Sequence, residues 1–284
     1  MVTSVKTNGS GNYSVKLAAG KYVLKITSSG FEELNMSVTV TAGSTVSAPK
    51  AKMVKKAATN CVVSGTITNA LDGRGVPGAT IKVRTGINNK SGSYASGSTT
   101  TNSSGNYSLT LKTGTYTLEV NAEGYVKGYI NVSASGSTCK NQNTSITPVV
   151  ESGKIRIVLT WGEQPRDLDS HLKFNIDGTT GSVSYGNKKY YRDGVEFVQL
   201  DHDDTSSYGP ETITINDPDA TEYVYYVYNF SGESSLAGSD AKVVVYSGDR
   251  EIATFTAPST GSGYYWDVFT IRGDQIQTIN VIHD

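Results

Sequence analysis

The sequence is poor in the features that mark many common classes of protein. Its 284 residues include two cysteines, three histidines and seven prolines, and no apolar run is long enough to cross a bilayer as a helix. The formal charge of -1 gives no electrostatic case for nucleic acid or an anionic membrane as a partner. The first residues, Met1 to Lys6, are too polar for a signal peptide. Membrane insertion and nucleic-acid binding are therefore not expected.

The two cysteines, Cys61 and Cys139, bracket the middle of the chain. An even pair near the first and last strands of one predicted module is typical of a disulfide in an oxidising compartment. Two separate buried thiols are the alternative. A metal site built on cysteine is not expected, because the sequence has no CxxC pair and no nearby histidine partner. We predict a disulfide between Cys61 and Cys139.

Glycine, tyrosine and small polar residues are abundant instead. Thirty glycines, and 18 tyrosines against six phenylalanines, suit strands that are joined by tight turns and carry amphipathic aromatics. A chain of this length can form two or three domains, each with its own core. The predicted fold class is all-β, with tandem small β-sandwich modules followed by a larger C-terminal β-sandwich.

The first half of the sequence contains an internal repeat. Residues 7–17 (TNGSGNYSVKL) recur as residues 101–111 (TNSSGNYSLTL), at an offset of 94 residues, and each copy predicts three strands joined by glycine turns. The second copy also has earlier strands, from Cys61 to Val83, which the first copy lacks. We therefore expect the chain to start inside a module, whose open edge must be paired, covered or frayed. The predicted domains are residues 1–52 (truncated module), 53–150 (complete module) and 151–284.

The second copy carries motifs of a known family. Val-Ser-Gly-Thr-Ile, Gly-Val-Pro-Gly-Ala-Thr-Ile-Lys-Val and Gly-Thr-Tyr-Thr-Leu-Glu-Val, in this order, resemble the carboxypeptidase regulatory-like domain over about Cys61 to Thr147. The resemblance implies a seven-stranded, transthyretin-like or carbohydrate-binding-like sandwich, which serves mainly as a spacer or accessory module. Function varies across that fold.

The pattern changes after Gly153. Ile155, Ile157, Leu159 and Trp161 alternate, which predicts a strand with one buried face, and eight or nine strands without a helical period predict a larger sandwich. The motif LTWGEQPRDLDSHL at residues 159–172, with the later LDHDDT and YGPETI, resembles a poorly characterised secreted bacterial domain whose hallmark is a tryptophan strand followed by Asp-Leu-Asp. The resemblance indicates the domain type and says little about activity.

The same segments hold the densest cluster of acidic residues in the sequence. On an extended strand, Asp167, Asp169 and His171 share one face. We expect Asp201 and Asp203 of an adjacent segment to lie on the same face, with Glu211 near. Carboxylates this dense repel one another unless a cation, an arginine or backbone donors compensate them. A metal site is the first hypothesis, and a solvated acidic rim is the alternative. The predicted ligands are Asp167, Asp169, Asp201, Asp203 and Glu211, with His171 and Asp204 as possible additions. So many oxygen ligands favour calcium, whereas His171 with two aspartates would suit zinc or another transition metal.

Three classes of function follow from these features. We expect a non-catalytic, extracellular or cell-surface bacterial protein of adhesin type, a monomer in which stalk modules present the metal-binding sandwich to a glycan or protein ligand. The alternative is the carbohydrate-binding module of a secreted multidomain protein. A glycan-processing enzyme is the least favoured class, because nothing distinguishes an acid from a base among the carboxylates and no nucleophile elbow, HExxH or P-loop occurs. The aromatic residues singled out for stacking on sugar rings are Tyr190, Tyr191, Tyr208 and Trp266.

Overall fold

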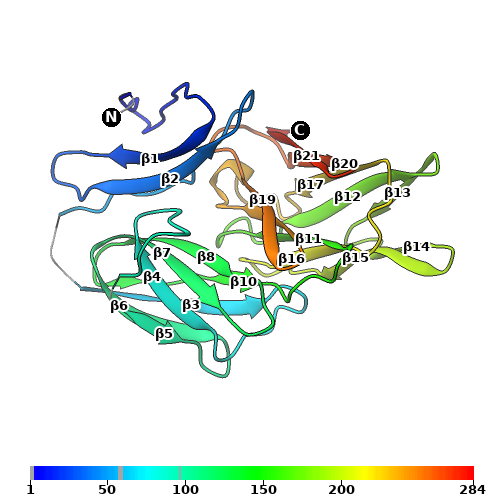
Figure 1. Ribbon diagram of the computed structural model, residues 1–284, viewed down its shortest axis with the longest axis horizontal. Helices are drawn as coiled ribbons and strands as arrows, with labels where there is room; N and C mark the ends of the chain where they lie inside the picture. The colour runs from blue at the N-terminus through cyan, green and yellow to red at the C-terminus, as the bar shows by residue number, and fades with distance from the viewer. Residues whose placement is uncertain (1–2, 57–59, 96) are drawn as a thin grey trace.

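The computed structural model describes residues 3–56, 60–95 and 97–284, and within them the protein is built from β-strands (Figure 1). The one helical element in these ranges is a single 3-10 turn, η1 (Leu236–Gly238). Among the same residues, no helix is long and apolar enough to cross a membrane. The all-β prediction is confirmed.

The N-terminal segment forms one hairpin. β1 (Gly20–Ile26) pairs antiparallel with β2 (Leu34–Val40), and Leu34, Met36 and Val38 pack with Ile87 of the next module. The strand predicted within residues 7–17 is not formed. The equivalent strand of the second copy is stabilised by pairing with β3, and no described strand takes the place of β3 beside the first copy.

The middle module is a sandwich of two sheets. Alternation in the repeat segment turns Tyr107, Leu109 and Leu111 inward, where they pack with Ile81 and Val83 of the facing sheet. One sheet has the order β10 (Thr144–Ile146), β3 (Asn60–Asn69), β6 (Asn106–Lys112), with β9 (Thr138–Cys139) also on β3; the other has the order β5 (Ser98–Thr100), β4 (Thr80–Thr85), β7 (Gly114–Asn121), β8 (Gly128–Ala134).

The predicted disulfide is absent from the structure, in which Cys61 and Cys139 are free thiols. β9 pairs with β3 in a parallel register that places Cys139 opposite Val63, two residues beyond Cys61. From strand spacing and rise, this offset separates the two cysteine Cα atoms by about 8 Å, more than the roughly 7 Å that a disulfide allows. Each Sγ instead donates a hydrogen bond to a backbone carbonyl, and burial raises the pKa of both thiols.

The C-terminal sandwich has a six-stranded and a five-stranded sheet. Its core lies between the sheets and includes the rings of Phe174, Tyr223, Tyr225 and Trp266. The six-stranded sheet has the order β14 (Lys189–Arg192), β15 (Val195–His202), β16 (Glu211–Ile215), β11 (Ile155–Thr160), β18 (Lys242–Ser247), β19 (Arg250–Thr256); the five-stranded sheet has the order β13 (Thr179–Val183), β12 (Asp169–Ile176), β17 (Glu222–Tyr228), β20 (Tyr265–Arg272), β21 (Gln275–His283).

The middle module packs against the outer face of the six-stranded sheet. Arg156 of β11 donates from Nη1 to Thr147 Oγ1 at 2.9 Å and to the Pro148 carbonyl at 3.0 Å. The outer face of this sheet is therefore an interface between domains rather than a free surface. The apolar part of the interface consists of Ala70, Val126, Val150, Val158, Val244 and Tyr246.

Candidate metal centre

Three carboxylates meet at one end of the C-terminal sandwich. Asp169 is the first residue of β12, Glu211 is the first residue of β16, and Asp203 directly follows β15. One oxygen from each lies within 4.8 Å of the other two. Asp169 and Glu211 are 3% and 0% exposed, and each of the three residues has a buried carboxylate oxygen without a hydrogen-bond partner in the described part of the chain. Unpaired buried carboxylates are costly, which makes this group a natural cation site.

A fourth carboxylate, Asp167, lies beside this group. It is 4% exposed, and its Oδ1 also lacks a hydrogen-bond partner among the described residues. Burial and then the negative charge of Asp203 raise its pKa. Asp167 is therefore close enough to interact electrostatically with the three converging carboxylates, although it is outside the group whose oxygens lie within 4.8 Å.

Burial and mutual repulsion favour protonation of Asp169 and Glu211. Burial, followed by the charges of Asp167 and Asp203, raises the pKa of Asp169 to about 7. Burial also raises the pKa of Glu211 well above its usual range, although Glu211 Oε2 accepts a hydrogen bond from the backbone N–H of Ser170. Burial also acts to raise the pKa of Asp203 and is the largest single effect there, but the hydrogen bonds with Lys188 Nζ at 2.8 Å and with Glu211, together with the charge of Lys188, lower this pKa. A divalent cation would replace these protons and relieve the repulsion.

Asp201 does not belong to the group, contrary to the prediction. The register of β15 against β16 shifts between Leu200 and His202, and this irregularity breaks the alternation on which the prediction rested. Asp201 Oδ2 accepts a hydrogen bond from Thr214 Oγ1 at 2.6 Å, and Oδ1 accepts one from Gln199 Nε2 at 2.6 Å. Burial raises its pKa to about 6, and the positive charge of Arg156 opposes the rise. Asp201 thus takes part in hydrogen bonds beside the domain interface rather than in the converging carboxylate group.

The two possible additional ligands also lie outside the group. His171 is on β12 two residues after Asp169, but its ring stacks on Tyr226 at 4.8 Å between centroids, and burial lowers its pKa to about 4. Asp204 Oδ1 accepts hydrogen bonds from the backbone N–H and the hydroxyl of Ser206. The converging side chains therefore offer oxygen atoms alone, a donor set that suits calcium or magnesium better than zinc.

The loop between Asp203 and Glu211 is fixed by Trp161. Gly209 has a φ of +73°, and a Cβ at this position would lie 2.7 Å from Trp161 Cζ3, so only glycine fits. Ser207 and Tyr208 also have positive φ, and their backbone N–H groups donate to the carbonyls of residues 166 and 162. The tryptophan strand and the Gly-Pro-Glu segment of the sequence are therefore two parts of one structure, which places Glu211 beside Asp169.

The aromatic residues singled out for sugar stacking do not form one surface. Trp266 is fully buried and donates from Nε1 to Asn280, so it cannot stack on a ligand. Tyr190 packs edge-on against Phe174 of the core, at 4.9 Å between centroids. Tyr208 Oη accepts a hydrogen bond from Asn141 Nδ2 of the middle module at 3.0 Å. Of the four residues, Tyr191 on β14 is the one that is mostly exposed.

A different set of aromatic side chains gathers next to the carboxylates, on the outer side of the five-stranded sheet. The rings of Tyr228 and Tyr265 lie 5.0 Å apart, and those of Tyr185 and Phe230 lie 5.5 Å apart. Asp169 pairs with Tyr228 across the strands, so this surface adjoins the three converging carboxylates. The alternation of Tyr226, Tyr228 and Phe230 in the sequence was the signal that could have revealed it. We call this surface the aromatic face and define it as His171, Tyr185, Tyr226, Tyr228, Phe230 and Tyr265.

Two segments of the chain match known domain families. Residues 62–147 match the carboxypeptidase regulatory-like domain, which confirms the resemblance found in the sequence. Residues 5–53 match the PEGA domain, a different family from the one that the internal repeat suggested. Neither match extends into the C-terminal sandwich. No curated protein matches the chain.

Several solved structures show a distant likeness. A protein of unknown function, SAV2460, is 16% identical with a TM-score of 0.36, over 46% of this chain and 92% of that one. A streptococcal ancillary pilin is 11% identical with a TM-score of 0.26, over 74% and 66% of the two chains. The major pilin subunit of Bacillus cereus is 13% identical with a TM-score of 0.26, over 72% and 70%. These TM-scores are too low to support an argument about function.

Proposed function

We propose that this chain is a non-catalytic binding protein of the bacterial cell surface, in which the small β-modules act as spacers and the C-terminal sandwich binds calcium. The observation that carries the proposal is the convergence of Asp169, Asp203 and Glu211, with buried carboxylate oxygens that lack hydrogen-bond partners among the described residues. The match to the regulatory-like domain supports the spacer role. An enzymatic use of these carboxylates fits less well, because Glu211 has no exposed surface through which a sugar could reach it.

Thermal melting tests the calcium site. We expect the melting temperature to fall when a chelator is added and to recover with calcium. At a calcium concentration a hundredfold above Kd, binding should add about 2.7 kcal/mol to the free energy of unfolding. Asp203→Asn should abolish this response. Asp204→Asn is the matched control, because it removes a carboxylate from the same loop but outside the converging group. A melting temperature that ignores both chelator and calcium would overturn the proposal.

A second candidate function, glycan binding, is favoured by the aromatic face. Phe230, Tyr185 and Tyr265 are 51%, 46% and 37% exposed, and exposed rings next to polar groups suit the stacking of pyranose sugars. A glycan array with and without calcium tests this function. Binding should be lost in Phe230→Ala and retained in Tyr191→Ala, which removes a similarly exposed ring from the edge strand β14, outside the aromatic face. Equal loss in both variants would contradict the assignment to this face.

A further inference from the structure

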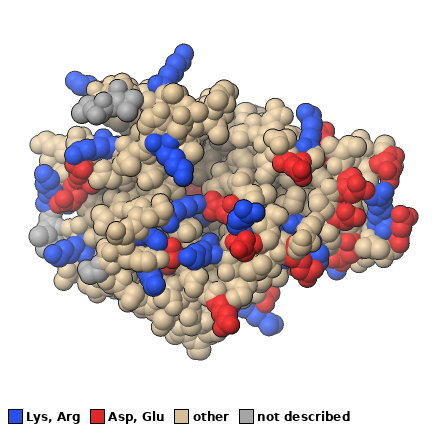
Figure 2. All heavy atoms as spheres, viewed as in Figure 1, with Lys and Arg blue, Asp and Glu red and all other residues tan. Residues whose placement is uncertain are grey.

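The net charge of the chain is near zero because its N-terminal and C-terminal parts carry opposite charges of similar size. Residues 1–150 contain 15 Lys and Arg against 5 Asp and Glu, a formal charge of +10, whereas residues 151–284 contain 10 against 21, a formal charge of -11. Figure 2 shows Lys and Arg gathered over the small modules on the left and Asp and Glu over the far end of the sandwich on the right. The small modules therefore attract anions, which the net charge of the whole chain does not indicate.

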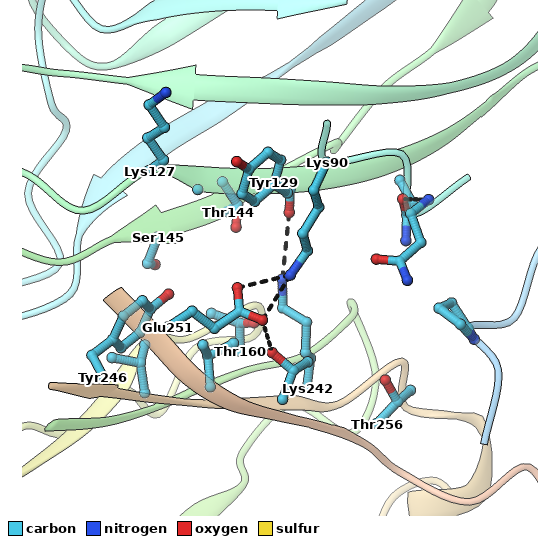
Figure 3. A pocket seen from close by; sticks show the side chains of 17 residues that line it. Lys90, Lys127, Tyr129, Thr144, Ser145, Thr160, Lys242, Tyr246, Glu251 and Thr256 are labelled. Atoms are coloured by element: carbon cyan, nitrogen blue, oxygen red, sulfur yellow. Dashed lines mark hydrogen bonds and ion pairs between the residues drawn. The ribbon is translucent and has the colours of Figure 1, made fainter. Parts of the chain in front are cut away.

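Lysines, three from the middle module and Lys242 from the C-terminal sandwich, line two hollows of the molecule. The first, shown in Figure 3, is a cavity of about 90 Å³ at the junction with the C-terminal sandwich, and Lys90, Lys127 and Lys242 line it. The second has a volume of about 250 Å³, and Lys82 and Lys127 line it. Lys127 lines both hollows, which therefore lie next to each other. We call the two hollows together the lysine groove and define it as Lys82, Lys90, Lys127 and Lys242.

The carboxylates in the groove neutralise only part of its charge. Glu251 is held by Lys90, whose Nζ lies 2.7 and 2.8 Å from its two oxygens. Glu119 is held by the buried Arg84 at 2.7 Å, and Lys127 Nζ reaches it only at 3.7 Å. Within the described residues, neither Lys82 nor Lys242 has a carboxylate within 4.0 Å. Two ammonium groups are thus left for an external anion.

Lys242 marks the inner end of the groove. Its Nζ lies 3.5 Å from the Tyr129 carbonyl oxygen, which is long for a hydrogen bond from nitrogen. Burial lowers its pKa, while the charge of Glu251 opposes that change. Hydroxyl-bearing side chains line the same cavity, among them Thr160 and Thr256 (Figure 3). An oxyanion at this point would accept hydrogen bonds from both the ammonium and hydroxyl groups.

The outer end of the groove has a flat, partly apolar wall. The ring of Tyr94 is 48% exposed, with the Arg84 guanidinium 4.0 Å and the Lys82 ammonium 4.9 Å from its centroid. Tyr94 Oη donates to Glu119 Oε1 at 2.7 Å, which fixes the orientation of the ring. Exposed lysines around an oriented ring suit the repeating unit of an anionic chain, with its charge on the lysines and its apolar surface on the ring.

We propose that the lysine groove binds a linear polymer that carries carboxylate or phosphate groups, with one anionic group over Lys82 and Lys127 and the next beside Lys242, because Lys90 is already held by Glu251. The charge of the groove selects against neutral glycans. This site is separate from the calcium site and does not depend on it.

Binding of the full chain to immobilised polygalacturonate, long-chain polyphosphate and neutral dextran, all in EDTA, tests the proposal. We expect binding to at least one polyanion and none to dextran, with an affinity that falls steeply as salt rises. The polymer that binds shows whether carboxylate or phosphate is the preferred group. Because calcium is absent throughout, failure of this experiment and failure of the calcium site are distinguishable.

Matched charge variants locate the site. The double variant Lys82→Gln/Lys127→Gln should weaken binding by about tenfold or more, because two charged contacts are lost. Lys112→Gln/Lys140→Gln removes the same charge from exposed positions of this module outside the groove and should change the affinity far less. The lysines replaced in the two variants are all exposed, so both variants should keep the melting temperature of the wild type. Equal losses in the two variants, or no binding to either polyanion at low salt, would overturn the proposal.

Discussion

Replacing Asp169 by asparagine removes one charge from the carboxylate group and preserves the shape of the side chain. Burial and neighbouring carboxylates raise the pKa of Asp169 from 3.8 to about 7. Between these two values the folded protein holds a proton that the unfolded chain has lost, so the stability of the metal-free protein falls as pH rises through this window. At about 1.36 kcal/mol for each pH unit, the free energy of unfolding lost through Asp169 is at most about 4 kcal/mol. Asp169→Asn should remove that loss.

Urea denaturation in EDTA at pH 5 and pH 8, followed by addition of calcium at pH 8, measures both effects. The metal-free wild type should be less stable at pH 8 than at pH 5, and Asp169→Asn should be more stable than the wild type at pH 8. With calcium the order should reverse, because the variant loses a ligand and the wild type gains binding energy. Asp204→Asn controls for the general loss of a negative charge. If Asp169→Asn is no more stable than the wild type at pH 8 in EDTA, the carboxylates form a solvated rim and the metal centre is wrong.

Two further predictions concern the loop and the thiols. Gly209→Ala should destabilise the protein by about 1–3 kcal/mol and weaken its response to calcium, because a Cβ would meet Trp161 and displace Glu211; a calcium-dependent melting curve equal to that of the wild type would contradict the role given to this glycine. Titration of the denatured, unreduced protein should find two reactive thiols, since Cys61 and Cys139 are free; finding none would restore the disulfide predicted from the sequence.

Strands in which apolar and polar residues alternate could be predicted from the sequence, because a strand with one buried face has an apolar residue at every second position. Ile155, Ile157 and Leu159 marked β11 in this way. The edge strand β14 is hard to recognise in the sequence, since among Lys189 to Arg192 only Tyr190 packs against the core and the strand pairs on one side only. The strand expected within residues 7–17 failed for a different reason: a strand needs a partner, and sequence similarity to a paired copy does not supply one.

The candidate site was predictable in part. Asp169, Asp203 and Glu211 were named because acids are dense in two short segments, and those three converge. Asp201 was included wrongly because an irregularity in register cannot be seen in an isolated strand. Trp266 was included wrongly because neighbouring residues of a strand point to opposite faces, and the sequence does not show which of Tyr265 and Trp266 faces the core. The lysine groove was missed altogether, because its members come from separate strands and loops.

The interface between the middle module and the C-terminal sandwich fixes the orientation in which the sandwich meets a ligand. Arg156 and the apolar residues around Val158 and Val244 join the two domains, so the sandwich does not swing freely on a tether. A rigidly mounted head loses less rotational freedom on binding than one on a flexible linker. If the aromatic face binds glycans as proposed, many copies aligned on one surface would present it in a common direction, and weak contacts with a repetitive glycan would add through avidity.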